Sequence, residues 1–336
     1  MNARIRGTAL KPRTLSWSRT VPRELVHRAS LAEVLLTDVL RIDEKRFTAA
    51  ASWPRSHPTF PLDGPAVHHP LMAVETLRQL GIYIPLRYFR VPVNTKLLIT
   101  DLFFGVEPGA QPRVCHGATR VTCRAVVDGL RTDTRGAATG LRLRVEFLAN
   151  GTVFARAGGG ARFLSPGRYA DVRGETSGGW PPPTPAGLLR PDPASLGVSH
   201  SRDVLVGLTG SRGHGGDGGP EERHRRGGPL RAGAVDGRDV VVDAADPWHP
   251  FFFDHPTDHV PGIVLLEAGR QAAALASGGA LLRLAGARLS APRFTEFAPA
   301  ARVTCVRHDG TCVVRFGQNG QCPAFGVLSF HSLSRA

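Results

Sequence analysis

The stretch DHPTDHVPGIVLLEAGRQ, residues 254–271, joins a turn rich in proline and histidine to a strongly apolar run. Gly262 stands directly before that run and marks the expected start of a helix. Glu267 and Arg270 interrupt the run three residues apart, which places both side chains on one helix face. Two interpretations stay open. The pair stabilises the helix as a local ion pair, or the helix delivers a carboxylate into an apolar pocket for chemistry.

The same pattern occurs twice in the chain. RFTAAASWPRSHPTF (46–60) aligns without gaps on RDVVVDAADPWHPFF (238–252), and ETLRQ (75–79) aligns on EAGRQ (267–271) at the same shift of 192 positions. The second alignment pairs Glu75 with Glu267, Arg78 with Arg270 and Gln79 with Gln271. Several matches in one order at one shift indicate an internal duplication.

Both copies predict the same α+β unit, in which a sheet wraps around one helix. Alternating apolar and polar residues predict the strands, and proline or glycine precedes each helix. In the first copy we expect strands at 34–40, 47–53, 95–106, 120–127, 141–148 and 153–163, and a helix at 71–84. In the second copy we expect strands at 204–206, 240–244, 293–297, 302–307, 311–316 and 325–331, and a helix at 263–284.

Composition shifts set the expected domain limits. We predict an N-terminal domain at 15–170, a linker rich in glycine and proline at 171–196, and a C-terminal domain at 197–332. Within the last, residues 207–237 are rich in glycine and arginine, where the first copy has only a short connection. We interpret this stretch as a disordered insertion.

The charge of the chain is strongly positive, +14 over 336 residues, yet only three of its 42 basic residues are lysine. The arginines are scattered and do not interleave with aromatic residues, so we do not expect nucleic acid as a partner. A basic surface is suited to anionic carriers and phosphorylated substrates.

Other features predict a cytoplasmic protein. No apolar run approaches the ~20 residues that span a membrane, and the N-terminus lacks the apolar segment of a signal peptide. Five cysteines without a CxxC pair favour neither a disulfide framework nor a zinc site. We expect no metal and no organic cofactor.

Three motifs together carry a family resemblance: VPRELVHRASLAEVLLTD (21–38), HHPLMAVETLRQLGIY (68–83) and DHPTDHVPGIVLLEAGRQAA (254–273). The chain resembles the A-factor (γ-butyrolactone) biosynthesis family of actinomycetes and, more distantly, the β-hydroxyacyl carrier-protein dehydratases. The resemblance implies a tandem hot-dog fold, with the two sheets joined side by side around two helices.

The resemblance also implies an activity. Such an acyltransferase moves a β-ketoacyl chain from acyl carrier protein to the hydroxyl of dihydroxyacetone phosphate, on the way to a γ-butyrolactone signal. The family's proposed functional positions correspond here to Glu75, Glu267 and Arg270, and Arg78 follows from the internal repeat.

The residue chemistry fits this reaction. An alcohol needs a base to attack a thioester, and burial in an apolar helix is expected to raise the pKa of Glu267 toward the working range. Arg270 is expected to hold that carboxylate or to meet the substrate phosphate. Backbone N–H groups at Gly262 can polarise the thioester carbonyl.

Two alternatives to the acyltransferase stay open, another enzyme that uses His255 and a protein that binds without catalysis. A dehydratase needs a histidine base beside the acid, and His255 stands twelve residues before Glu267. A hot-dog dehydratase or thioesterase is therefore the second hypothesis. A non-catalytic acyl- or lactone-binding regulator is the third. The sequence leaves open the oligomeric state, the acyl chain length, and whether one or both copies form a working pocket.

Overall fold

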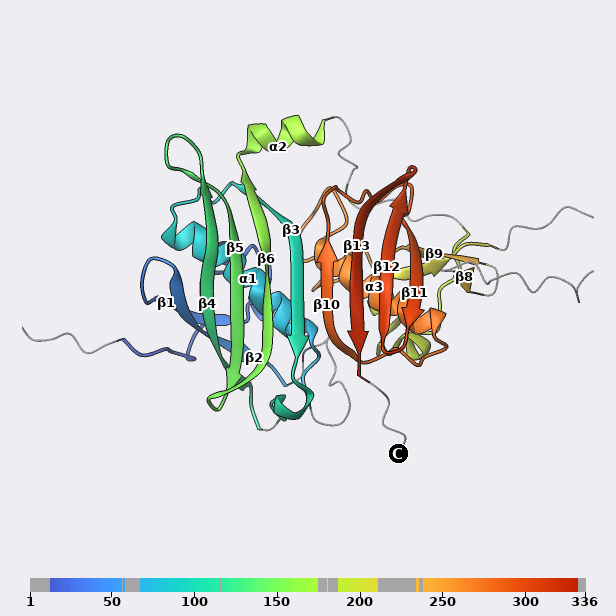
Figure 1. Ribbon diagram of the computed structural model, residues 1–336, viewed down its shortest axis with the longest axis horizontal. Helices are drawn as coiled ribbons and strands as arrows, with labels where there is room; N and C mark the ends of the chain where they lie inside the picture. Colours follow the sequence, from blue (N-terminus) through green and yellow to red (C-terminus); the bar gives the residue numbers. More distant parts are fainter. Residues whose placement is uncertain are drawn as a thin grey trace, which may run out of the picture.

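A computed structural model describes residues 13–55, 57, 67–114, 116–174, 180, 187–210, 234–235 and 238–331. Thirteen strands among these residues form one antiparallel sheet, and two long helices, α1 and α3, lie against one face of it (Figure 1). The predicted α+β tandem hot-dog architecture, two units side by side, is confirmed. Residues 211–233 and 236–237 of the predicted insertion lie outside the described residues.

The first half wraps six strands around α1. The strands follow the order β1-β2-β4-β5-β6-β3 across the sheet. Their bounds are β1 Leu36–Arg41, β2 Arg46–Trp53, β3 Lys96–Val106, β4 Thr119–Thr132, β5 Ala138–Ala149 and β6 Thr152–Leu164, and α1 covers Leu71–Tyr88.

The second half continues the sheet in the order β10-β13-β12-β11-β9-β7, with β8 beside β9. The bounds are β7 Val206–Leu208, β8 Ala234–Val235, β9 Arg238–Val242, β10 Leu284–Ser290, β11 Arg302–His308, β12 Thr311–Gln318 and β13 Gln321–Phe330, around α3 at Gly262–Ala276. Short 3-10 turns precede the first strand of each half: η1 Arg23–Val26 and η2 Leu31–Glu33, then η4 Pro193–Leu196 and η5 Ser201–Asp203.

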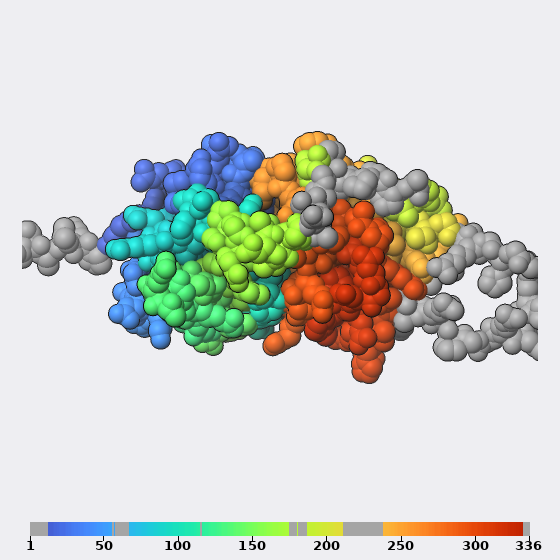
Figure 2. Space-filling view, turned by 90° about the horizontal axis from the view of Figure 1, so that it is seen from above, coloured from blue at the N-terminus to red at the C-terminus, as the bar shows by residue number. Residues whose placement is uncertain are grey.

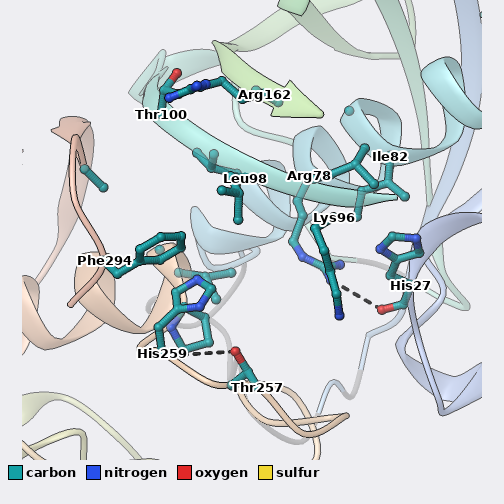
Figure 3. Close-up of a pocket in the computed structure, with 18 of the residues that line it drawn as sticks. His27, Arg78, Ile82, Lys96, Leu98, Thr100, Arg162, Thr257, His259 and Phe294 are labelled. Carbon is teal, nitrogen blue, oxygen red and sulfur yellow. Dashed lines mark hydrogen bonds between the residues drawn. The ribbon is translucent and has the colours of Figure 1, made fainter. Parts of the chain in front are cut away.

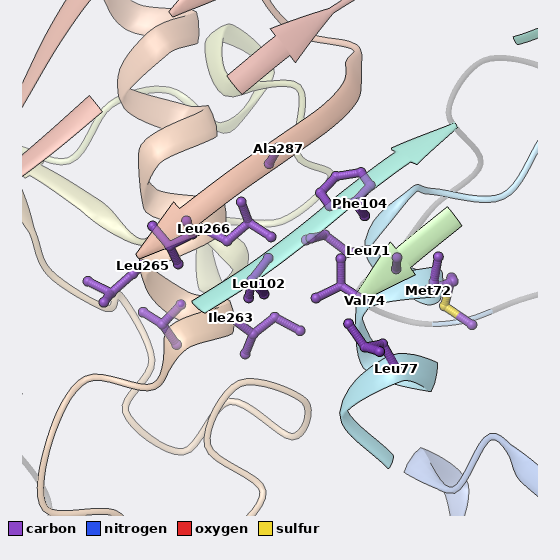
Figure 4. Close-up of a cluster of buried hydrophobic side chains, with 14 of the residues drawn as sticks. Leu71, Met72, Val74, Leu77, Leu102, Phe104, Ile263, Leu265, Leu266 and Ala287 are labelled. Carbon is purple, nitrogen blue, oxygen red and sulfur yellow. The ribbon is translucent and has the colours of Figure 1, made fainter. Parts of the chain in front are cut away.

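Strands β3 and β10 join the halves. They pair antiparallel, with Leu102 opposite Leu289 in the register. Beneath them, apolar side chains from the starts of α1 and α3 pack into one core, as Figure 4 shows for Val74, Leu77 and Ile263. Burial of such side chains contributes roughly 1.5–3 kcal/mol each, so the halves share a single core rather than a mobile contact.

The end of the second helix was predicted wrongly. Helix α3 ends at Ala276 rather than at 284, because Gly278 and Gly279 follow in the left-handed region with φ of 61° and 85°. Residues 277–283 form turns and bends, and residues 284–290 form β10, which pairs with the other half. The strand expected at 293–297 does not form, and those residues belong to a loop. Pairing across the duplication, rather than local pattern, decides this segment.

A short helix, α2 (Pro166–Arg173), follows the first half and lies at the boundary between the halves (Figure 2). The Ser165 side chain caps it by accepting a hydrogen bond from the Arg168 N–H. Among the described residues, no helix is both long enough and apolar enough to cross a membrane.

Candidate active site

A cavity of about 1270 Å³ lies between the halves, bounded by α1, β3, α2 and the segment 251–263. Its walls are apolar along α1 and the start of α3, where Leu77, Ile82 and Ile263 face it. Its polar and charged residues lie in groups. Figure 3 shows His27, Arg78 and Lys96 at one end, and Thr100 with Arg162 further along. The cavity therefore offers both an apolar surface and a cationic end.

Behind the cationic end, Glu75 is fully buried on α1. Its Oε1 accepts hydrogen bonds from Arg28 Nε (3.0 Å), Arg78 Nη1 (3.2 Å) and Gln79 Nε2 (2.7 Å). Arg28 also places Nη2 2.8 Å from Oε2. Two arginines thus share one carboxylate, and Asp254 lies 4.0 Å from Arg28 as a second acid beside the cluster.

Glu267 occupies the matching position on α3 and is 3% exposed. Arg270 donates to it from Nε, at 3.0 and 2.9 Å to the two oxygens, and from Nη2. Gln271 adds a bond of 3.0 Å. Arg270 is itself 1% exposed, and its Nη1 donates to the Leu196 carbonyl at 2.8 Å. This second cluster is neutral and sealed.

The expectation of a raised pKa at Glu267 is wrong. Burial acts to raise the pKa of this carboxyl, but the ion pair and hydrogen bonds with Arg270 outweigh burial and lower it. The same balance holds at Glu75, where Arg28 and Arg78 lower the pKa below its usual value. Both carboxylates are ionised at neutral pH. Glu75 Oε2 lies 2.8 Å from Arg28 Nη2, and the other three carboxylate oxygens accept hydrogen bonds from arginine or glutamine.

The glutamines tie each helix to its first strand. Gln79 accepts from the Leu35 N–H and donates to the Glu33 carbonyl, and Gln271 does the same with Leu205 and Asp203. The repeated histidines support the same junctions, with His57 bonded to the Glu33 carboxylate at 3.1 Å and His249 to Asp203 at 2.9 Å. The repeated Glu-x-x-Arg-Gln motif therefore has a structural role in both halves.

The turn after Phe251 crosses from the second half onto the first. Arg28 donates to the Phe251 carbonyl at 2.8 Å, and the Ser30 N–H donates to Asp254 Oδ1 at 3.1 Å. These bonds seat His255 in the cavity wall beside the first cluster. A residue of one half thus completes a site formed by the other.

His27 and Lys96 complete the cationic end. His27 ends η1 in the left-handed conformation (φ 49°), and its carbonyl accepts from Arg78 Nη2 at 3.3 Å. Desolvation, Arg78 and His255 lower the pKa of His27 to about 4. Desolvation and the nearby Arg78 and Arg28 also lower the pKa of His255. Both imidazoles are therefore neutral at pH 7, and Arg78 and Lys96 supply the positive charge.

Helix α2 closes one side of the cavity through an ionic network. Arg173 pairs with Glu296 at 2.7 Å and with Asp258 at 3.2 Å, and Tyr169 donates to the same Asp258 at 2.7 Å. His259 contributes a further bond of 2.7 Å to Asp258. These contacts engage the acidic groups of this wall within the protein.

The predicted site residues thus divide into two sets. Arg78, His255 and Gly262 line the cavity, whereas Glu75, Glu267 and Arg270 are buried and not among its lining residues. Sequence reasoning missed His27, Arg28 and Lys96. His27 and Arg28 lie in the first family-like motif, and Lys96 is one of only three lysines in the chain. Membership of the motif could have pointed to the first two residues, and the rarity of lysine could have pointed to the third.

The fold and the cavity define a double hot-dog protein with a site between its halves. A family model described as "A-factor biosynthesis hotdog domain" matches residues 11–165 and 233–289, and the chain belongs to that family.

Relatives with the same name share much of the chain's length. A 2-oxo-3-(phosphooxy)propyl 3-oxoalkanoate synthase of Streptomyces virginiae is 36% identical over 258 residues, 76% of each chain. A protein of that name from Streptomyces griseus is 29% identical and covers 91% of this chain and 94% of its own.

Two solved structures of low identity also match most of the chain. A putative thioesterase from Novosphingobium aromaticivorans covers 87% of this chain and 97% of its own, at 12% identity and a TM-score of 0.45. An acyl-ACP thioesterase from Bacteroides thetaiotaomicron covers 85% and 98%, at 10% identity and the same TM-score.

Proposed function

We propose that this protein is an acyltransferase that joins a 3-oxoacyl chain from a thioester to the hydroxyl of dihydroxyacetone phosphate. The relatives' name describes the ester that this reaction forms. The observation that carries the proposal is the cavity itself, which sets an apolar wall beside a cationic end. The apolar wall is suited to an acyl chain, and the cationic end is suited to a phosphorylated acceptor. Acyl carrier protein is the proposed donor, since an acidic carrier complements a strongly basic chain.

In the proposed reaction, the acceptor hydroxyl oxygen forms a bond to the thioester carbonyl carbon as the carbon–sulfur bond breaks. The hydroxyl proton passes to a base, and the departing thiolate takes up a proton. Neutral His255, seated in the cavity wall, is the proposed base. The first N–H groups of α3, at Gly262 and Ile263, have no acceptor within the helix and are proposed to bind the developing oxyanion.

This proposal moves the predicted chemistry away from the buried carboxylates. Glu75 and Glu267 are held by arginines with lowered pKa values, which makes them weak bases, and Arg270 has its guanidinium sealed against Glu267. Their proposed role is to hold each helix against its sheet.

Turnover by the full-length protein tests the function. The protein is incubated with a 3-oxoacyl thioester and dihydroxyacetone phosphate, and the phosphorylated ester is sought by mass spectrometry. We expect product from wild type, loss of at least a hundredfold in rate for His255→Gln, and no loss for His308→Gln, a histidine whose side chain is 87% exposed.

Other outcomes identify the alternatives. Free acid without ester indicates a thioesterase, and loss of water from a 3-hydroxyacyl thioester indicates a dehydratase. Binding of the acyl thioester without any turnover indicates a regulator.

A further inference from the structure

The two halves are equivalent at the Glu-x-x-Arg-Gln cluster but differ at two positions in front of it. Arg78 donates to the Val26 carbonyl as Arg270 donates to that of Leu196. Both carbonyls end a 3-10 turn that is capped by a left-handed residue, His27 in the first half and Gly197 in the second. Arg28 and Val198 follow the caps. The first half therefore has an imidazole and a guanidinium where the second has a hydrogen and an isopropyl group.

Arg28 changes what the helix arginine can do. In the second half, Arg270 holds Glu267 through Nε and Nη2, and its side chain is 2% exposed. In the first half, Arg28 takes that place at Glu75 through Nε and Nη2. Arg78 keeps a single 3.2 Å bond to the carboxylate, and its side chain is 18% exposed and lines the cavity.

Arg78 has donors left for a ligand. Its hydrogen bonds use Nη1 twice and Nη2 once. The guanidinium carries five N–H groups, so Nε–H and one Nη2–H have no hydrogen-bond acceptor within the described part of the chain. Lys96, at the start of β3, brings a second positive charge, with Nζ 5.5 Å from the Tyr169 ring. Figure 3 places Arg78, Lys96 and His27 together.

The neighbouring acids are otherwise engaged. Asp254 accepts backbone N–H groups of the first half and lies 4.0 Å from Arg28. Asp258 is held by Tyr169, Arg173 and His259. A dianionic group entering this end of the cavity therefore meets Lys96 and the cavity-facing donors of Arg78, whose carboxylate partner Glu75 is also held by Arg28.

We propose that Arg78, Lys96 and His27 bind the phosphate of the acceptor, and that Arg28 is a positioning residue that frees Arg78 for this task. The identity of the ligand as the acceptor rests on the proposed function. The phosphate subsite itself rests on the cluster and on the replacement of His27 and Arg28 by Gly197 and Val198 in the second half. By this assignment the duplicated protein has one acceptor site, built by the first half and completed by His255 of the second.

Binding to the intact protein tests the subsite without any turnover. Isothermal titration is carried out with dihydroxyacetone phosphate, with dihydroxyacetone, and with inorganic phosphate. We expect measurable binding of the phosphorylated compound and at least tenfold weaker binding of dihydroxyacetone. Lys96→Gln and Arg78→Gln should each weaken binding of dihydroxyacetone phosphate at least tenfold. Lys45→Gln, which removes the same charge from an exposed turn, should leave it within twofold.

Two results would overturn the subsite: equal affinity for the phosphorylated and unphosphorylated compounds, or equal losses in Lys96→Gln and Lys45→Gln. Inorganic phosphate separates two sources of the ligand. Competition by phosphate alone at the same concentration would assign the site to free phosphate, and the assignment to an acceptor would then be wrong.

Arg28 is tested through its effect on Arg78. Arg28→Val reproduces the second half, so Arg78 should close on Glu75 as Arg270 does on Glu267. We expect the KM for dihydroxyacetone phosphate to rise at least tenfold with the KM for the acyl thioester unchanged, and Arg28→Lys to restore part of the affinity. Circular dichroism checks that the variants fold. Equal rises in both KM values would show a general structural defect and overturn the positioning role.

The outcomes of the two proposals are distinguishable. If phosphate-dependent binding follows the expected ranking of variants but no ester forms, the acyltransferase assignment fails and the subsite stands. If ester forms at the same rate in wild type, Lys96→Gln and Arg78→Gln, the function stands and the subsite is wrong.

Discussion

The two halves hold the same helix carboxylate, arginine and glutamine, yet only the first half's arginine reaches the cavity. Glu267 pairs with one buried arginine, Arg270, and Glu75 is shared between Arg78 and Arg28. A single added side chain, Arg28, takes over the carboxylate and leaves donors of Arg78 directed at the cavity. Both halves thus have the same Glu-x-x-Arg-Gln cluster on the helix, and the residue beside the cluster, Arg28 or Val198, distinguishes them.

The strongest test of this comparison is to break the closed pair. Glu267→Gln leaves Arg270 buried without its counter-charge, and we expect a loss of about 3–5 kcal/mol in the free energy of unfolding, which urea denaturation measures. Any ester formation by the folded fraction should persist. A stable Glu267→Gln protein that has lost activity would restore the catalytic role that the sequence suggested.

A milder pair of substitutions compares the arginines directly. Lysine cannot reproduce the guanidinium fork, so Arg270→Lys should cost about 1–3 kcal/mol in stability, with no change in affinity for dihydroxyacetone phosphate. Arg78→Lys should be less destabilising, because Arg28 still neutralises Glu75, and should weaken acceptor binding. Urea denaturation and titration calorimetry of the two variants decide this. The reverse pattern would contradict the division between the halves.

Gly197 and His27 occupy matching positions in the left-handed region, and Gly197 has a close neighbour where a Cβ would lie. A Cβ at Gly197 would meet Leu282 Cδ2 at 3.2 Å, in addition to the strain of φ at 66°. We expect Gly197→Ala to lower the melting temperature by an amount equivalent to about 1 kcal/mol. His27→Asn, in which asparagine tolerates the left-handed region, should change stability at pH 7.5 less than Gly197→Ala does.

The smallest effect concerns pH. The folded-state pKa of His27, about 4, lies below the unfolded value near 6.5, so the unfolded chain binds the extra proton first. The contribution of His27 to stability is complete above pH 6.5 and is lost as the pH falls from 6.5 toward 4. Between pH 6.5 and pH 4, the free energy of unfolding of His27→Asn should fall less steeply with pH than that of the wild type. The difference between the two slopes should be less than the slope that one titrating proton produces. An unchanged slope would show that His27 is not desolvated.

Much of the fold was predictable because it was repeated. Matches at one constant shift identified two equivalent units, and alternation located most of the strands. The C-terminal end of α3 and strand β10 were missed for one reason. The apolar pattern of the helix continues in the sequence to residue 284, and only pairing with β3 makes 284–290 a strand.

The candidate site was predictable only in part. Proximity in sequence identified Glu267 and Arg270 and suggested a reactive carboxylate. Burial does act to raise its pKa, but the ion pair and hydrogen bonds with Arg270 outweigh burial and lower it. His27 and Lys96 stand 69 positions apart, and no spacing rule brings them together. The two side chains lie close together because His27 is the C-terminal cap of η1 and Lys96 is the first residue of β3.

The sequence by itself determined the duplication, the hot-dog architecture and the family, because these depend on local periodicity and on motifs that are repeated or shared. Tertiary structure alone decided which polar residues face the cavity and which are sealed behind it. The physical reason is that a charge's surroundings, not its position in a motif, set its pKa and its accessibility. In this chain those surroundings come from the opposite half and from Arg28, a side chain that the second half lacks.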